Sequence, residues 1–102
     1  MISTLEADEL SRSLQDKVIS PAKARGVTNR FILEHLRDGF CAGKPNYALV
    51  QTAPVWIVPI LFAGPDQAPK KAGEVIVQAL AGEIIGFTPV AEVMRNARAA
   101  VA

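Results

Sequence analysis

The chain has 102 residues, half of them hydrophobic, which fits one folded domain and excludes an intrinsically disordered protein. Its 11 basic and 10 acidic side chains give a net charge of +1, and this balance argues against capture of nucleic acid or of an acidic membrane surface by charge. We therefore expect a single domain over residues 1–102, with neither nucleic acid nor a membrane as its partner.

Cys41 is the only cysteine, so no disulfide can form within one chain, and a reducing, cytoplasmic setting fits best. The first 17 residues carry acidic side chains and lack the basic start and apolar core of a signal peptide. The most apolar run, around residues 53–63, is shorter than the ~20 residues that a membrane-spanning helix needs. These features predict a cytoplasmic protein.

The first third of the chain predicts helices. Leu10, Leu14 and Val18 recur every four residues, which predicts a helix over about residues 4–19 with a narrow apolar stripe. Ser20 and Pro21 then suit the start of a short helical turn or a loop that ends at Gly26.

A better helical pattern covers residues 27–39. Thr28 is its expected N-cap, Phe31, Ile32 and Leu36 form its expected buried face, and Gly39 is its expected terminator. The segment that follows, "CAGKPNYA", predicts a loop because of its glycine and proline.

Residues 49–63 predict extended structure, with breaks at Pro54 and Pro59. Alternation along "VWIVPILF" (residues 55–62) gives both of its faces apolar side chains. A proline cannot donate a ladder hydrogen bond, so Pro59 predicts an edge strand or a bulge at its position. The two apolar faces predict that something besides the helices covers one of them.

Residues 74–88 predict a tight hairpin in which Gly82 adopts a left-handed conformation at the turn. The expected register places Val75 opposite Phe87 and Val77 opposite Ile85.

A last helix is expected to begin with Thr88 as its N-cap and Pro89 as its first residue. The predicted fold is α+β in two layers, with helices packed on one face of a small antiparallel sheet in the order ααβββα.

Few residues in the sequence suggest chemistry. His35 and Cys41 form the one pair that invites a thiol-dependent activity, because a thiolate nucleophile needs a neighbouring base. One histidine and one cysteine are too few for a closed zinc site, so no metal and no cofactor is expected. "GFCAGK" (39–44) departs from a phosphate-binding loop in spacing and lacks the hydroxyl residue, so Gly39 is better explained as a helix stop.

Aromatic and apolar side chains around the proline-bearing strand are the candidates for binding. Aromatic residues are enriched at interfaces and in pockets, although packing under the helices explains Trp56 equally well. The candidates for an interface or a ligand site are Trp56, Val58, Ile60, Phe62 and Tyr47.

The segment "VQALAGEIIG" (77–86) resembles the last hairpin of small PepSY-type modules. The matching residues are Val77, Ala79, Gly82, Glu83 and Ile84, and Gln78 stands where those modules commonly carry an acid. The resemblance implies helices with an antiparallel sheet and a binding role; such modules often lie outside the cell or beside a membrane anchor and are proposed to restrain peptidases. It implies no catalytic residue.

These observations favour a non-catalytic interaction or regulatory domain that self-associates, as a homodimer, through an apolar strand face. One alternative is a small-molecule-binding or thiol-dependent enzyme with a pocket near Trp56, Tyr47, His35 and Cys41. Another is an antitoxin or immunity-type protein that acts on a protein partner.

Overall fold

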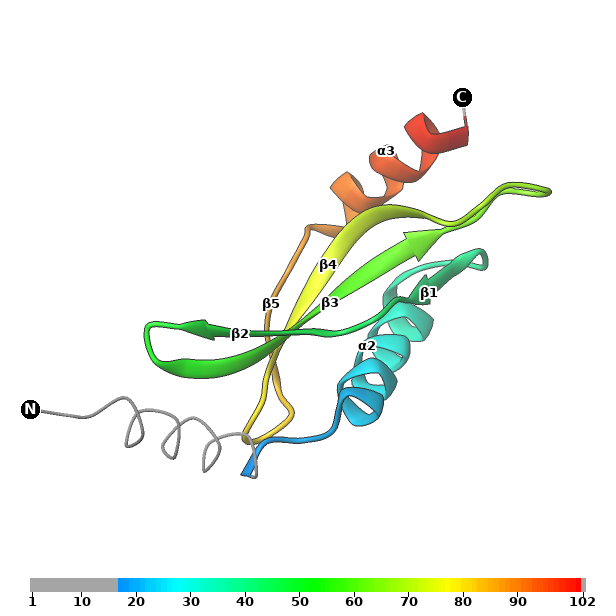
Figure 1. Cartoon of the computed structure of the whole chain (residues 1–102). Coiled ribbons are helices and arrows are strands. Elements are labelled where there is room, and N and C mark those ends of the chain that lie inside the picture. Colours follow the sequence, from blue (N-terminus) through cyan, green and yellow to red (C-terminus); the bar gives the residue numbers. More distant parts are fainter. Residues whose placement is uncertain (1–16, 102) are drawn as a thin grey trace, which may run out of the picture.

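The structure of the chain is a computed structural model that describes residues 17–101 (Figure 1). All strand pairs in it are antiparallel, so the chain has an α+β fold, as the sequence predicts. The elements in chain order are α2 (Pro21–His35), β1 (Phe40–Ala42), β2 (Asn46–Val50), β3 (Ala53–Phe62), β4 (Lys70–Gln78), β5 (Ile84–Phe87) and α3 (Val90–Val101).

The helix predicted over residues 4–19 lies outside the described residues as far as position 16, and Val18 and Ile19 are not helical. The strand count differs from the prediction, because the sheet has five strands where three were expected. The two additional strands, β1 and β2, lie mostly in the segment 41–48, for which the sequence predicts a loop, and β2 continues into Leu49 and Val50, for which it predicts extended structure.

Helix α2 is one continuous helix, which corrects the prediction of two segments divided near Gly26. It begins as expected: the Ser20 side chain accepts a hydrogen bond from the Lys23 backbone N–H at 3.1 Å, and Pro21 follows at the first position. Thr28 is a buried residue inside this helix and not an N-cap, since its hydroxyl donates to the Ala24 carbonyl at 3.0 Å. Gly39 lies past the helix end, in a left-handed turn (φ 98°) that leads into β1.

Strand β3 lies in the middle of the sheet, so the predicted edge position of Pro59 is wrong. One side of β3 pairs with β4, and the other side pairs with β2 along its first half and with β1 along its second half. Pro59 stands between these halves, where its carbonyl accepts a hydrogen bond from the Gly43 N–H at 2.8 Å. The missing N–H of the proline therefore falls at the break between β1 and β2, and no strand partner loses a donor. A register shift against β4 follows at Ile60/Leu61.

A two-residue turn joins β2 to β3, and the sequence does not predict it. Gln51 and Thr52 both have positive φ angles, 50° and 67°, as a tight hairpin of opposed strands requires. Asparagine and glycine normally signal such a turn, whereas a β-branched threonine is strained there. The tertiary pairing of β2 with β3 overrides the local preference of these two residues.

The β4–β5 hairpin forms largely as predicted. Gly82 has a φ of 75°, and Val75 pairs with Phe87. The other expected pair is wrong, because Val77 lies opposite Ile84 and a bulge inserts Ile85 as an additional residue. This bulge leaves Ile85 58% exposed.

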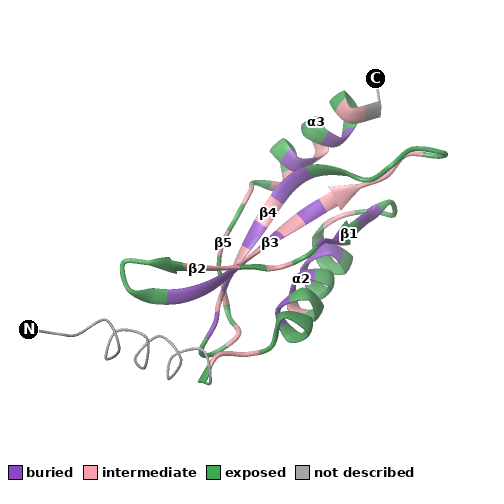
Figure 2. Cartoon of the chain, in the orientation of Figure 1, coloured by how far each residue is buried: buried purple, intermediate pink, exposed green. Residues whose placement is uncertain are grey.

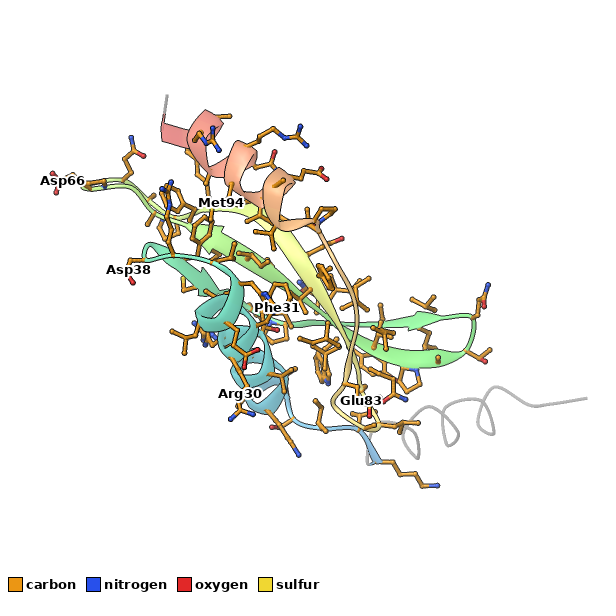
Figure 3. All side chains as sticks on the ribbon, turned by 180° about the vertical axis from the view of Figure 1, so that it is seen from behind. Arg30, Phe31, Asp38, Asp66, Glu83 and Met94 are labelled. Atoms are coloured by element: carbon orange, nitrogen blue, oxygen red, sulfur yellow. The ribbon has the colours of Figure 1, made fainter. Side chains whose placement is uncertain are left out.

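Both helices contribute side chains to one buried cluster that they share with the sheet. Phe31 and Ile32 of α2 and Val93 and Ala97 of α3 belong to this cluster. Figure 3 labels Phe31, whose ring lies 5.0 Å from that of Phe87. The strand residues in the cluster include Trp56, Val58, Ile60, Val75 and Val77, which alternate along β3 and β4.

The start of α3 differs from the prediction. The helix begins at Val90, and the Thr88 hydroxyl accepts a hydrogen bond from the Glu74 N–H at 3.0 Å, so it serves β4 instead of the helix end. The Pro89 carbonyl accepts the first helical bond, from Val93. Of the helices within residues 17–101, none combines the length and apolarity that a membrane crossing requires.

Gly43→Ala should lower the free energy of unfolding by about 1–3 kcal/mol. A Cβ at this position would lie 2.8 Å from Pro59 Cγ and 3.0 Å from Leu61 Cδ1, both in the middle of the sheet. Urea denaturation followed by circular dichroism measures the change.

Gly26→Ala is the matched control, because a Cβ there meets nothing within 4 Å and the residue is helical. It should raise stability by about 0.5–1 kcal/mol. If both substitutions shift stability equally, Gly43 does not have the packing role described here.

Candidate functional site

Trp56 and Tyr47 lie together on neighbouring strands, as the prediction of a joint site requires. Their ring centroids are 5.5 Å apart at an interplanar angle of 72°, an edge-to-face pair. The Trp56 Nε1–H donates to the Ile19 carbonyl at 3.0 Å, and the Ile19 N–H donates to the Ala79 carbonyl at 2.8 Å. The Trp56 side chain is buried, with 9% of its surface exposed, and its hydrogen bond to Ile19 attaches the segment before α2 to the sheet.

A hollow of about 360 Å³ opens beside this aromatic pair. Its size is at the lower end of small-molecule sites, which span about 300–1,000 Å³. The walls are mostly apolar or aromatic and come from two strands and from the segment that enters α2: Val18, Ile19, Ser20, Pro21, Tyr47 and Trp56. The sequence singled out the two aromatic residues but not the other walls, since only the fold brings Ile19 to Trp56.

The other three predicted interface residues lie in or against the core. Val58 and Ile60 are fully buried, so they have no accessible surface to offer a partner. Phe62 is partly buried, and its ring packs at 4.8 Å from that of Phe40. The sequence correctly placed these residues on one face of the strand, but on that face they lie in or against the buried cluster.

The opposite face of the sheet carries a second apolar group, which we call the outer face. It consists of Ile57, Pro59 and Leu61 of β3 and Ile76 of β4, all of intermediate exposure and none of them part of the buried cluster. Figure 2 shows this pattern as an alternation of buried and intermediate residues along both strands.

Polar residues surround the outer face. Asn46 pairs with Ile57, and Glu74 pairs with Pro59. The Lys71 Nζ lies 3.1 Å from the Glu74 carboxylate oxygen, although this pair is exposed and contributes little to stability. An apolar centre with a polar rim is the usual composition of a protein interface.

The structure does not bring His35 and Cys41 together. His35 is on α2, and its ring lies 4.6 Å from that of Phe31. Cys41 is on β1 and pairs with Leu61 of β3, so its side chain lies on the outer face. Its neighbours Phe40 and Ala42 belong to the buried cluster. The thiol alternative therefore lacks the base that it needs.

Two side chains of α2 bind the backbone of β1, and the sequence analysis assigned them no such role. The Asn29 amide oxygen accepts from the Ala42 N–H at 2.9 Å, and the Arg25 Nε–H donates to the Ala42 carbonyl at 3.0 Å. The four-residue spacing of Arg25 and Asn29 places both side chains on one side of the helix. This spacing is the only sign of their shared role that can be read from the sequence. Together these two side chains occupy the N–H and the carbonyl of Ala42, which point away from β3 at this edge.

Within the described range, no group of three or more His, Cys, Asp or Glu side chains is placed to hold a metal ion. The sequence matches no family model, no curated protein and no solved structure. The resemblance of the hairpin to PepSY-type modules therefore stays a prediction.

His35→Ala should leave the rate of alkylation of Cys41 by iodoacetamide unchanged, because the imidazole and the thiol lie on different sides of the sheet. Mass spectrometry at several times after mixing measures the rate. A marked drop in the rate for the folded variant would contradict this placement and revive the thiol hypothesis.

Proposed function

We propose that this chain is a non-catalytic interaction domain that self-associates through the outer face of its sheet. The observation that carries the proposal is the apolar group formed by Ile57, Pro59, Leu61 and Ile76, on the face opposite the buried cluster that α2 and α3 share with the sheet. In this proposal the domain has two layers, helices and sheet, and a second copy forms the third layer.

The chemistry of the outer face supports a second copy of the chain as the partner. A twofold contact uses the same patch on both subunits, so the patch must complement itself. The apolar centre meets an identical centre, and the rim carries one charge of each sign, Lys71 and Glu74, so that each can face the opposite charge of the other copy. Burial of this surface would stabilise the contact by about 25 cal/mol per Å² of apolar area, before the cost of association is subtracted.

The separation of His35 from Cys41 supports a non-catalytic role over the thiol-dependent alternative. The cytoplasmic setting expected from the sequence remains part of this proposal. An antitoxin or immunity-type role would use the same surface for a different protein, and a monomeric chain that binds such a partner would favour that alternative.

Ile57→Lys should remove the outer-face contact and so halve the mass of the associated chain, because a charge in the apolar centre would be buried without a partner in the contact. Light scattering coupled to size exclusion measures the mass at tens of micromolar, where a homodimer with a Kd of about 1 μM is mostly associated. Leu61→Lys is a second variant of the same face and should have the same effect.

Leu33→Lys is the matched control, since Leu33 is an apolar residue of α2 that is already 83% exposed and far in the fold from the outer face. It should leave the mass unchanged. Circular dichroism confirms that each variant is folded. A native chain that is monomeric at these concentrations would refute the proposal.

The hollow beside Trp56 supports a second candidate function, the binding of a small aromatic molecule. Tyr47 and Trp56 supply ring faces and edges, and Ile19 and Pro21 supply apolar walls.

Anilinonaphthalenesulfonate is a suitable probe, because Trp56 is the only tryptophan and its emission reports the hollow directly. Saturable quenching of this emission is expected, together with an affinity at least about tenfold weaker in Tyr47→Ala, the equivalent of about 1.4 kcal/mol. Equal binding by the native chain and by Tyr47→Ala would place the probe elsewhere and remove the candidate.

A further inference from the structure

Strand β5 forms one border of the sheet and presents apolar residues there. It pairs with β4 and is the last strand in the sheet order (Figure 1). Ile85 is 58% and Phe87 53% exposed, and Figure 2 shows the strand as exposed and intermediate only. The segment Ile84–Phe87 contains neither a charge nor a proline, the two devices that commonly keep a border strand from pairing with another chain.

The border formed by β1 differs, because α2 closes it. Asn29 and Arg25 occupy the N–H and the carbonyl of Ala42, as described above. No side chain hydrogen bond to the backbone of residues 84–87 is found among the described residues. The helix thus occupies the outward backbone groups of Ala42, whereas no such bond is found at β5 among the described residues.

The pairing with β4 determines which backbone groups of β5 point outward. The Thr88 N–H donates a hydrogen bond to the Glu74 carbonyl at 3.0 Å, and the Glu74 N–H donates one to the Thr88 hydroxyl, also at 3.0 Å. Since bonded and non-bonded residues alternate in an antiparallel pair, the backbone groups of Phe87 point away from β4. Its ring packs against that of Phe31, with 5.0 Å between the ring centroids.

We propose that β5 pairs with β5 of a second copy, antiparallel about a twofold axis at Gly86, so that one sheet continues through both chains. In this register Ile85 of each copy lies opposite Phe87 of the other, a β-branched residue against an aromatic one, which is a favourable cross-strand pair. Glu83 lies opposite Pro89, so no two like charges meet. The self-complementarity of this uncharged segment is the reason for a second copy as the occupant.

This contact uses different atoms from the outer face, and it therefore goes beyond the function proposed above. The two contacts can be removed separately. A chain with both would form a dimer of dimers, and a chain with the outer-face contact removed should still pair through β5.

The decisive test is a disulfide between copies of Gly86→Cys in a Cys41→Ser background. A Cβ at position 86 meets only Ile76, at 3.6 Å or more, so the cysteine fits. Gly86 faces its counterpart as a non-hydrogen-bonded pair, for which the Cα atoms lie about 4.5 Å apart, within disulfide reach. Under mild oxidation we expect a covalent dimer on a non-reducing gel, in the Ile57→Lys background as well.

Ala91→Cys with Cys41→Ser is the control, because residue 91 is an exposed position in the first turn of α3 and the antiparallel pairing puts its two copies at opposite ends of the paired strands, so it should give no covalent dimer. Adding Ile85→Lys to the Gly86→Cys chain should abolish the crosslink, since two lysines then face apolar rings across the axis. Circular dichroism checks that each chain is folded.

Three results would overturn the inference. In the first, the native chain associates, Gly86→Cys gives no crosslink, and Ile57→Lys lowers the mass to that of a monomer. The outer-face proposal then survives. The second is a native chain that is monomeric and gives no crosslink, which refutes both contacts. The third is a mass that keeps rising with concentration without a crosslink, which indicates β5 pairing with β2 of the next copy in an open chain.

Discussion

The fold depends on a ten-residue strand that has partners on both sides and a proline near its middle. A proline inside a sheet removes one hydrogen bond from the ladder, and β3 accommodates this because its partner on that side is divided into β1 and β2. The residues that join these two strands need no bond from position 59, and Gly43 approaches closely enough to use the Pro59 carbonyl. The position of the break, the two short strands and the glycine all follow from this one requirement.

Helix α2 has two structural roles. Its inner residues cover the strand face that carries Trp56 and Val58, and its side chains Arg25 and Asn29 close the border at β1. The segment before it is attached to the sheet by the Trp56 indole. The outer face lies outside the buried cluster to which both helices contribute, and β5 is a border strand, so these are the parts of the sheet that we propose for contact with a second copy.

The sequence predicted the elements whose signals are local. Ser20 and Pro21 start α2, Gly82 turns the last hairpin, and the α+β class follows from the pattern of strands and helices. It failed where the decision was tertiary. Gln51 and Thr52 contain no turn signal, so β2 was taken for a loop, and Thr88 has good capping chemistry but serves the Glu74 backbone. In the candidate site, Tyr47 and Trp56 were found by composition, whereas Ile19 and Pro21 were not.

By itself the sequence determined that β3 has two apolar faces and that Pro59 must lie where a backbone donor is not needed, because alternation and the proline ring are properties of the chain alone. Only the tertiary structure decided that this place is a gap between two partner strands instead of the border of the sheet. It also decided that Val58 and Ile60 pack under the helices while Ile57 and Leu61 stay on the outer face. Either face of an apolar strand can be buried, and only the packing of the buried cluster, to which α2 and α3 contribute, selects which one.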